Sequence, residues 1–404
     1  MKKQYLLVFI FAGLIALLNA CNMGKAYKAL IVTGQNNHNW KVSSPILKKL
    51  LEQTGLFSVD IAIAPEKGGD MNSFNPNFSK YKVVVIDYNG ESWSEKTQKA
   101  FVDYVKNGGG VVSYHAADNS FPEWKEYNEM IGLGGWGNRS QKDGPYMYYK
   151  NNKLVTDTTA GRGGSHGQRH EFEITIRDTE NPITKGLPQR WIHGADELYS
   201  QLRGPGKNMD ILATAFAAPK MGGTGRDEPM LMTITYGNGR IFHTTLGHPD
   251  ADGGPSMECV GFITTFQRGA EWAASGEVTQ KVPYDFPNAG GSSLRTDFKE
   301  LTLDGDLAKI GNYDYSKSTK YFVDLQSRIR YEGKTPEALQ QFEKKMIKVL
   351  ENNDATADGK KLLLREISWM GSELSIPVVQ ELTKNPQLKD EAEFALARLQ
   401  PSTH

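Results

Sequence analysis

Five histidines of this chain lie at or near the ends of apolar, strand-like runs of sequence. They are His38, His115, His170, His193 and His248. Because the ligands of open α/β sheets bind beyond the carboxyl ends of the strands, polar side chains at those ends converge on one crevice. Imidazole exchanges protons near neutral pH and is also a common metal ligand. The pattern therefore predicts proton transfer or metal ligation at a shared rim. The alternative for any single histidine is a strand cap or a partner for buried backbone.

The sequence from residue 25 onward predicts the strands and helices that must position these histidines. Ser44 suits the N-cap of a helix with Pro45 at its first position, and Ser94 suits the N-cap of a second helix. The predicted strands are 29–33, 57–63, 83–87 and 111–114, and the predicted helices are 44–53 and 94–106. Strands that alternate with helices in this way predict an α/β fold with a doubly wound parallel sheet.

The remainder of the chain changes character twice. A glycine-rich stretch from about 130 to 230 predicts loops that decorate a site. Further strands are predicted at 172–176, 211–216, 231–236 and 241–245, followed by a closing helix at 261–274. We expect the α/β domain over 25–281 and a linker over 282–298. Residues 299–404 lack strand alternation and predict a small all-α domain, either HEAT-like or a plain helical bundle.

The first twenty residues have the pattern of a lipoprotein signal peptide. Lys2 and Lys3 precede an uncharged apolar run, 5–18, that is short for a membrane-spanning helix. Leu18-Asn19-Ala20-Cys21 then resembles a lipobox, so residues 1–20 are expected to be removed and Cys21 to be lipidated. This predicts a protein tethered by a lipid to the bacterial cell envelope, on the periplasmic or cell-surface side. Ordinary secretion or an uncleaved anchor is the alternative.

Composition excludes several classes of function. The chain has 47 basic and 47 acidic residues, which gives no electrostatic footprint for nucleic acid. Cys259 is the only other cysteine, so no internal disulfide is expected, and its apolar surroundings favour a buried small hydrophobe over a nucleophile. Ser113 and Ser165 lack the GxSxG elbow of serine hydrolases. His243 lies inside a predicted strand and is expected in the core.

Four motifs resemble the ThuA-like, or trehalose-utilisation, domain family over about 28–275. They are Tyr114-His115-Ala116-Ala117-Asp118, Asn181-Pro182-Ile183-Thr184-Lys185-Gly186-Leu187, Asp196-Glu197-Leu198-Tyr199 and the run from Gly239 to His248. The resemblance implies a flavodoxin-like core similar to class I glutamine amidotransferases, and an association with bacterial sugar use, notably of 3-keto-glycosides. The helical extension lies outside it. Amidotransferases place a cysteine after a central strand, where this chain has His115, so thiolate chemistry is unsupported.

A 3-keto-sugar has acidic hydrogens beside its ketone, and their removal requires a base and a group that stabilises the oxyanion. We expect His115 to act as the base, with Asp118 either orienting it or hydrogen-bonding a sugar hydroxyl, and with Glu197 or Asp196 as the partner acid. Elimination, hydration or isomerisation would follow. The residues expected to bind the sugar are His38, Trp40, Trp136, Arg139, Arg169, His193 and Tyr199.

Metal ligation competes for the same groups. His115, His170 and His248, with a carboxylate, would suit zinc or another divalent ion acting as a Lewis acid, in a metal-dependent hydrolase for example. The Asp196-Glu197 pair has the alternative of capping a helix or pairing with arginine, and Gly247-His248-Pro249 that of a rigid turn. A further alternative is a non-catalytic module that binds a glycan while the helical domain contacts a protein partner or a second copy.

Overall fold

The computed structural model describes residues 26–298, 302–317 and 319–400. The predicted signal peptide and Cys21 lie outside these residues. Within them, no helix has the length and apolar character needed to cross a membrane. The described residues up to Lys281 form one compact unit together with Asn288–Ser292, and Val282–Pro287 belongs with the residues from Ser293 onward in a second unit.

The first unit is built around a mixed sheet whose parallel half carries the predicted strands. These are β1 (Tyr27–Thr33), β2 (Phe57–Ile63), β3 (Val83–Ile86), β4 (Gly110–Tyr114) and β13 (Gly239–Thr244). They lie side by side in the order β2-β1-β3-β4-β13, and every neighbouring pair is parallel. This is the flavodoxin-like order, in which the strand ends next to β1 and β3 form the usual binding crevice.

The other half of the sheet is antiparallel. Beyond β13 the order continues through β12 (Asp227–Tyr236), β11 (Met209–Phe216), β8 (His170–Ile176) and β9 (Arg190–Asp196). A hairpin of β5 (Tyr146–Lys150) and β6 (Lys153–Asp157) pairs with β12. Two short strands, β7 (Ser165–His166) and β10 (Tyr199–Ser200), form a separate ribbon. The predicted doubly wound parallel sheet is therefore confirmed as the core of a larger mixed sheet.

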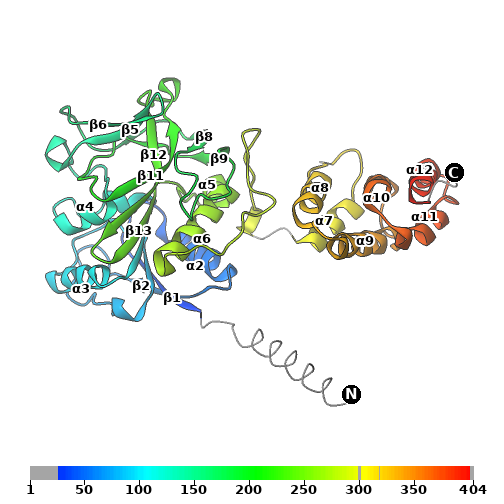
Figure 1. Ribbon diagram of the computed structural model, residues 1–404. Coiled ribbons are helices and arrows are strands. Elements are labelled where there is room, and N and C mark those ends of the chain that lie inside the picture. Colours follow the sequence, from blue (N-terminus) through cyan, green and yellow to red (C-terminus); the bar gives the residue numbers. More distant parts are fainter. Residues whose placement is uncertain (1–25, 299–301, 318, 401–404) are drawn as a thin grey trace, which may run out of the picture. The chain divides into compact units, whose positions relative to one another are not determined.

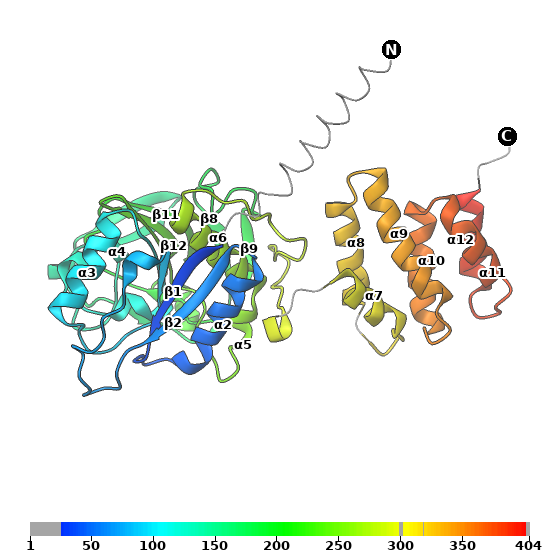
Figure 2. The same ribbon diagram turned by 90° about the horizontal axis from the view of Figure 1, so that it is seen from below.

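Helices cover both faces of the parallel half (Figures 1 and 2). On one face, α2 (Trp40–Gln53) packs on β1 and β2, and α6 (Val260–Ser275) packs on β3, β4 and β13. On the other, α3 (Glu95–Lys106) packs on β13, and α4 (Lys125–Ile131) on β12 and β13. A buried aromatic cluster that includes Trp93, Phe101 and Trp124 fills this second layer. The two helical layers pack on the strands whose carboxyl ends carry the candidate site.

The start of α2 differs from the prediction. The helix begins at Trp40, four residues before Ser44, so Ser44 is not its N-cap and Pro45 lies inside the helix. The hydroxyls of Ser43 and Ser44 donate instead to the buried carboxylate of Asp87, at 2.6 and 2.7 Å. Tertiary hydrogen bonds therefore replace the local capping role. The prediction for the second helix is confirmed, because Ser94 accepts a hydrogen bond from the backbone N–H of Thr97.

The second unit is all-helical. Its helices are α7 (Leu303–Gly311), α8 (Lys320–Glu332), α9 (Pro336–Glu351), α10 (Ala357–Met370), α11 (Ile376–Leu382) and α12 (Lys389–Leu399). One apolar core joins them, with Leu325, Met346, Leu363 and Ala395 fully buried. A core of its own makes this unit a domain by physical criteria. The predicted all-α character of this region is confirmed.

Candidate functional site

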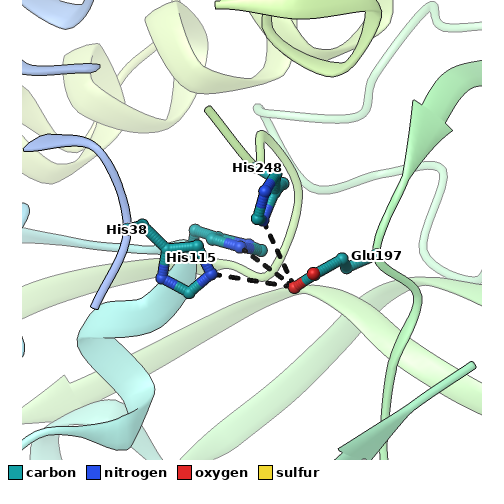
Figure 3. Close-up of side chains that lie close together, drawn as sticks. All are labelled: His38, His115, Glu197 and His248. Atoms are coloured by element: carbon teal, nitrogen blue, oxygen red, sulfur yellow. Dashed lines mark ion pairs between the residues drawn. The ribbon is translucent and has the colours of Figure 1, made fainter. Parts of the chain in front are cut away.

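Three histidines converge on one carboxylate at the carboxyl ends of the strands (Figure 3). His38 follows β1, His115 follows β4 and His248 follows β13. The nearest imidazole nitrogens of these three residues lie 3.7, 3.9 and 3.3 Å from Oε2 of Glu197. Glu197 itself follows β9, in the antiparallel half of the sheet. The group therefore combines three histidines from the parallel half of the sheet with one carboxylate from the antiparallel half.

His115 is held in an unusual backbone conformation at the point where β4 ends. Its φ is +43°, a left-handed value that costs free energy in a residue with a side chain and that concentrates at functional sites. Its Nδ1 lies 2.7 Å from the carbonyl oxygen of Thr245, so Nδ1 carries the proton and donates it to that oxygen. Nε2 is left with its lone pair, 3.1 Å from the Tyr199 hydroxyl. The ring is thereby fixed in one tautomer that faces the group.

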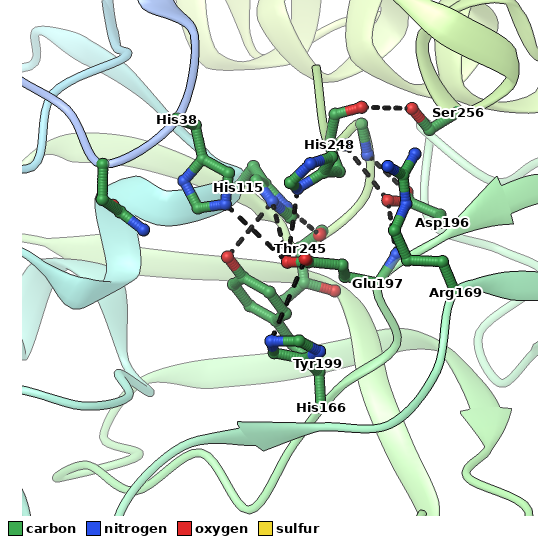
Figure 4. A network of polar contacts seen from close by, with 12 residues as sticks. His38, His115, His166, Arg169, Asp196, Glu197, Tyr199, Thr245, His248 and Ser256 are labelled. Carbon is green, nitrogen blue, oxygen red and sulfur yellow. Dashed lines mark hydrogen bonds and ion pairs between the residues drawn. The ribbon is translucent and has the colours of Figure 1, made fainter. Parts of the chain in front are cut away.

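A single buried carboxylate, that of Asp196, supports the other side of the group (Figure 4). It accepts hydrogen bonds from the backbone N–H groups of Glu197 at 2.7 Å, Gly247 at 2.7 Å and His248 at 3.1 Å. His193 lies beneath it, with Nε2 at 2.8 Å. Gly247 has φ of +100°, and a Cβ there would lie 2.6 Å from Phe262, so the turn into His248 requires glycine.

The loop that carries His38 is anchored through Asn36. The Asn36 side-chain oxygen accepts from the backbone N–H of His38 at 3.0 Å and lies 3.4 Å from His38 Nδ1. The Asn36 amide nitrogen donates to Asp87, which also receives Ser43 and Ser44 of α2. Strand β3, helix α2 and the His38 loop are therefore tied together at one buried acid.

A cavity of about 310 Å³ opens beside the group. It is lined by Asn37, His38, Asn89, Asn119, Trp136, Gly137, His166, Glu197 and Tyr199. Nε2 of His166 lies 3.9 Å from the second oxygen of Glu197, and the His166 side chain is 39% exposed (Figure 4). A second cavity of about 620 Å³ shares Asn37 and Asn89 with the first and includes Trp40. Together the two cavities offer room for a ligand of several rings.

Burial and neighbouring charges set the protonation states of the group. Burial, reinforced by the nearby His38, lowers the pKa of His115 to about 3, so this imidazole is neutral near pH 7. Burial alone would raise the pKa of Glu197, but the imidazoles of His248 and His38 outweigh it and hold that pKa well below its usual range. Asp196 is likewise ionised, because the contact with His193 overcomes burial and lowers its pKa to about 2. The neutral imidazole of His115 therefore faces the ionised carboxylate of Glu197.

Several residues predicted for the site lie at the cavity or in the group beside it. His38, Trp136, Glu197 and Tyr199 line the cavity, and His115 and His248 form part of the group. Trp40 lines the adjoining cavity instead. Arg169 lies near the group but pairs with Asp250 through two hydrogen bonds, and both side chains are one-third exposed.

Other predicted residues are placed where a substrate does not reach them. Asp118, His193 and Asp196 are fully buried. Asp196 acts through the hydrogen bonds that position Glu197 and His248. Arg139, 3% exposed, donates to the backbone carbonyls of Asn119, Ser120 and Gly135 and so holds a loop together. The polar groups of Arg139, His193 and Asp196 serve internal hydrogen bonds, which buried polar groups require, and Asp118 lies 3.6 Å from Nε2 of His243. His243 is buried and bonded to the Ile131 carbonyl, which confirms its predicted core position.

His170 is not brought into the group. Its Nδ1 lies 2.7 Å from the backbone oxygen of Gln168, and its ring contacts Phe172. The structure places Glu197 and His38 beside His115 and His248 instead. The sequence pattern did not mark His166, because this residue lies in a glycine-rich stretch with no strand-like run before it. Asn37, Asn89 and Asn119 also line the cavity, but no motif in the sequence around them indicates a binding role.

The group has the composition of a metal site. One ligand atom from each of His38, His115, Glu197 and His248 lies within 4.8 Å of all the others. Within the described ranges, no other set of three or more His, Cys, Asp or Glu side chains has this spacing. Three imidazole nitrogens and one carboxylate oxygen are the donor set preferred by zinc and its neighbours in the first transition series.

Comparison with known proteins identifies relatives of the first unit. The profile of the family described as ThuA, trehalose utilisation, matches residues 28–273. A solved ThuA-like protein from Parabacteroides merdae is 54% identical, with a TM-score of 0.67, and the match covers 68% of this chain and 100% of that one.

A second solved ThuA-like protein, from Bacteroides uniformis, is 20% identical over 64% of this chain and 96% of its own, with a TM-score of 0.42. The search of curated proteins found no significant match to this sequence.

Proposed function

This chain belongs to the ThuA family, and from that premise we propose that it is a carbohydrate-active enzyme that removes a proton beside the ketone of an oxidised glycoside. A 3-keto-glycoside is the substrate class that the family resemblance favours. The observation that carries the proposal is the cavity itself, where the imidazole–carboxylate group, the Tyr199 hydroxyl and the half-exposed His166 face one small space.

The walls of the cavity suit a sugar ring. Trp136 offers an apolar face, and its ring lies 4.8 Å from that of Tyr199. The side-chain amides of Asn37, Asn89 and Asn119 line the same space and match the donors and acceptors of hydroxyl groups. Pockets with an apolar wall and a few polar groups are typical of small-molecule sites.

The chemistry begins with removal of the proton at C2, next to the C3 ketone. His166 is the base in this proposal, because its Nδ1 lies 2.9 Å from the Gly167 carbonyl and donates to it, which leaves the lone pair on Nε2 at the cavity. The proton moves from C2 to His166 Nε2, and the electron pair of the C–H bond passes to the ketone oxygen. The Tyr199 hydroxyl donates to that developing oxyanion.

His115, the base expected from the sequence, has a different role in this scheme. Its side chain is 1% exposed, and a pKa of about 3 leaves it a weak proton acceptor. Its ring instead stacks on that of Tyr199, with centroids 4.5 Å apart, and so positions the hydroxyl whose single proton is donated to the oxyanion. The enediolate then either regains a proton, which gives isomerisation, or expels the C1 substituent as an alkoxide that takes up the proton held by His166, which gives elimination. Water adds to the unsaturated product in the case of hydration.

All these outcomes share the first step, so exchange of the C2 hydrogen tests the proposal directly. Methyl 3-keto-glucoside in D₂O should lose its C2 proton signal in NMR when the protein is added, while the reduced glycoside should not. His166→Ala should slow exchange at least about 100-fold, the usual scale for a general base. His170→Ala, outside the group, should leave the rate unchanged. Binding without any exchange would overturn the enzyme proposal and favour a glycan-binding module.

We also propose the envelope location that the first residues predict. A lipid on Cys21 would hold the α/β unit at a membrane surface without a spanning helix. Cells fed an alkyne-bearing fatty acid should label the wild-type protein and not Cys21→Ala, and equal labelling of both would overturn the anchor. A protein partner for the helical unit stays a prediction.

A further inference from the structure

We propose that His38, His115, His248 and Glu197 bind one divalent transition-metal ion, with zinc as the best fit, and that this ion meets the ketone oxygen of the substrate. Binding of the ion does not depend on the proposed function, whereas its contact with a sugar ketone does. Two of its members, His38 and Glu197, line the cavity, so the ion would lie beside the substrate and take part in chemistry.

The spacing of the four side chains fits a shared ion better than it fits direct hydrogen bonds. The three imidazole nitrogens lie 3.3 to 3.9 Å from Glu197 Oε2. A charge-assisted hydrogen bond would bring such atoms to about 2.7–2.9 Å. Atoms bound at about 2.0–2.2 Å from a tetrahedral zinc lie roughly 3.4 Å from one another. The separations from Glu197 are near that spacing, and all four ligand atoms lie within 4.8 Å of one another, so small side-chain shifts would place them around a common centre.

The far sides of the imidazoles are arranged as they are in known metal sites. Nδ1 of His115 donates to the Thr245 carbonyl, and Nδ1 of His38 faces the side-chain oxygen of Asn36. Each contact places the proton on Nδ1 and leaves Nε2 as a lone-pair donor. An outer hydrogen bond of this kind orients metal-bound histidines and raises their basicity.

His248 supplies the third nitrogen by a different route. Its backbone N–H is held by Asp196, and its backbone carbonyl accepts from the Ser256 hydroxyl. Its Nδ1 is buried and makes no hydrogen bond to the described residues. A buried polar atom without a partner is costly, so its position calls for a ligand. The nitrogen points at Glu197, where the other two imidazoles also meet (Figure 3).

The donor set selects the class of ion. Calcium and magnesium prefer oxygen ligands, and three imidazoles exclude them as good fits. Imidazole with one carboxylate suits zinc, and also cobalt, nickel or ferrous iron. Four protein ligands fill a tetrahedral zinc ion, so the ketone oxygen would be a fifth ligand, a coordination number to which zinc sites can expand. Tyr199, 3.1 Å from His115 Nε2, is placed to hydrogen-bond that oxygen.

Metal binding is measured on the full-length mature protein without any sugar. Protein stripped with a chelator and dialysed should bind zinc at one equivalent in calorimetry, and the zinc-loaded protein should melt at a higher temperature. Loading with Co²⁺ should give visible absorption bands of a nitrogen-ligated ion. His38→Ala and His248→Ala should each weaken zinc binding by at least about 100-fold, because even outer-shell changes cost 10–100-fold.

His170→Ala is the matched control, since it removes an imidazole near but outside the group and should bind one zinc with wild-type affinity. Wild-type protein that takes up no zinc, and gives no Co²⁺ bands, would overturn the proposal even if the variants fail to fold. Unchanged affinity in both His38→Ala and His248→Ala would also overturn it. A protein that binds zinc but exchanges no sugar proton would refute the proposed function alone.

Discussion

The carboxylate of Asp196 accepts a hydrogen bond from the backbone N–H of Glu197 at 2.7 Å, and this contact fixes the acid at the centre of the site. The same carboxylate receives Gly247 and His248 from the other half of the sheet. One buried charge therefore sets the distance between Glu197 and His248.

Asp196→Asn should lower both the stability and the zinc affinity of the protein. Each carboxylate oxygen accepts two hydrogen bonds, so the amide nitrogen of asparagine must face donors whichever way it turns. We expect a loss of about 3 kcal/mol in the free energy of unfolding, the scale for breaking a buried ion pair. Urea denaturation measures it, and calorimetry with zinc measures the second effect.

Asp250→Asn provides the comparison, because it removes a carboxylate from a pair with Arg169 that is one-third exposed. Exposed pairs contribute about 0–1 kcal/mol. Equal losses in the two variants would show that Asp196 has no special role.

Tyr199→Phe should reduce kcat at least about 100-fold while leaving KM and stability little changed. The substitution removes only the hydroxyl that lies 3.1 Å from His115 Nε2, and loss of one oxyanion donor costs about this much. Tyr127→Phe also removes a buried tyrosine hydroxyl, one that donates to the Ala117 carbonyl away from the cavity. It should retain activity within a few fold. The deuterium-exchange rate measures both, and a fully active Tyr199→Phe would remove Tyr199 from the mechanism.

Much of the fold follows from local sequence pattern. The predicted strand at 57–63 matches β2, and the predicted ends of β1 and β4 match the structure to the residue. Strands buried on both faces have continuous apolar runs, which is why these elements were visible. Parallel strands end at the same edge of a sheet. The sequence could therefore predict that His38, His115 and His248 lie close together, although not their exact arrangement.

The fourth member of the group could not be placed in this way. Glu197 follows β9, whose position across the sheet depends on long-range antiparallel pairing that no local pattern encodes. The same limit explains His193 and His170, which lie within strands β9 and β8 of the antiparallel half. His193 points into the core and is fully buried, whereas His170 bonds back to its own loop. Local periodicity marked these strands but did not reveal which face the histidines occupy.

Trp40→Ala should weaken binding of long substrates selectively. Trp40 lines the second cavity, which meets the first at Asn37 and Asn89, so a second sugar unit would extend there. We expect KM for a 3-keto-disaccharide to rise about 10-fold, equivalent to about 1.4 kcal/mol. KM for the methyl glycoside should stay constant. Trp369→Ala, an exposed tryptophan of the helical unit, should change neither value. An equal rise for both substrates would contradict a second subsite.

Asp87 should make the stability of the protein depend on pH. Burial raises its pKa to about 7, against the opposing hydrogen bonds from Ser43, Ser44 and Asn36. The unfolded chain has a pKa near 3.9 for this group, so the folded state holds the proton more tightly. This contribution to stability is fully present below about pH 4 and is lost as the pH rises through about 7.

Asp87→Asn is neutral at every pH and lacks this term, so the comparison isolates one group. The free energy of unfolding of the wild type minus that of the variant should fall by about 2–3 kcal/mol between pH 5 and pH 8, since each pKa unit corresponds to about 1.4 kcal/mol. Paired urea titrations at pH 5, 6, 7 and 8 measure the difference, and other titrating groups cancel in the subtraction. A difference that stays constant over this range would mean that Asp87 is ionised throughout, and its serine and asparagine partners would then stabilise the charge by more than burial penalises it.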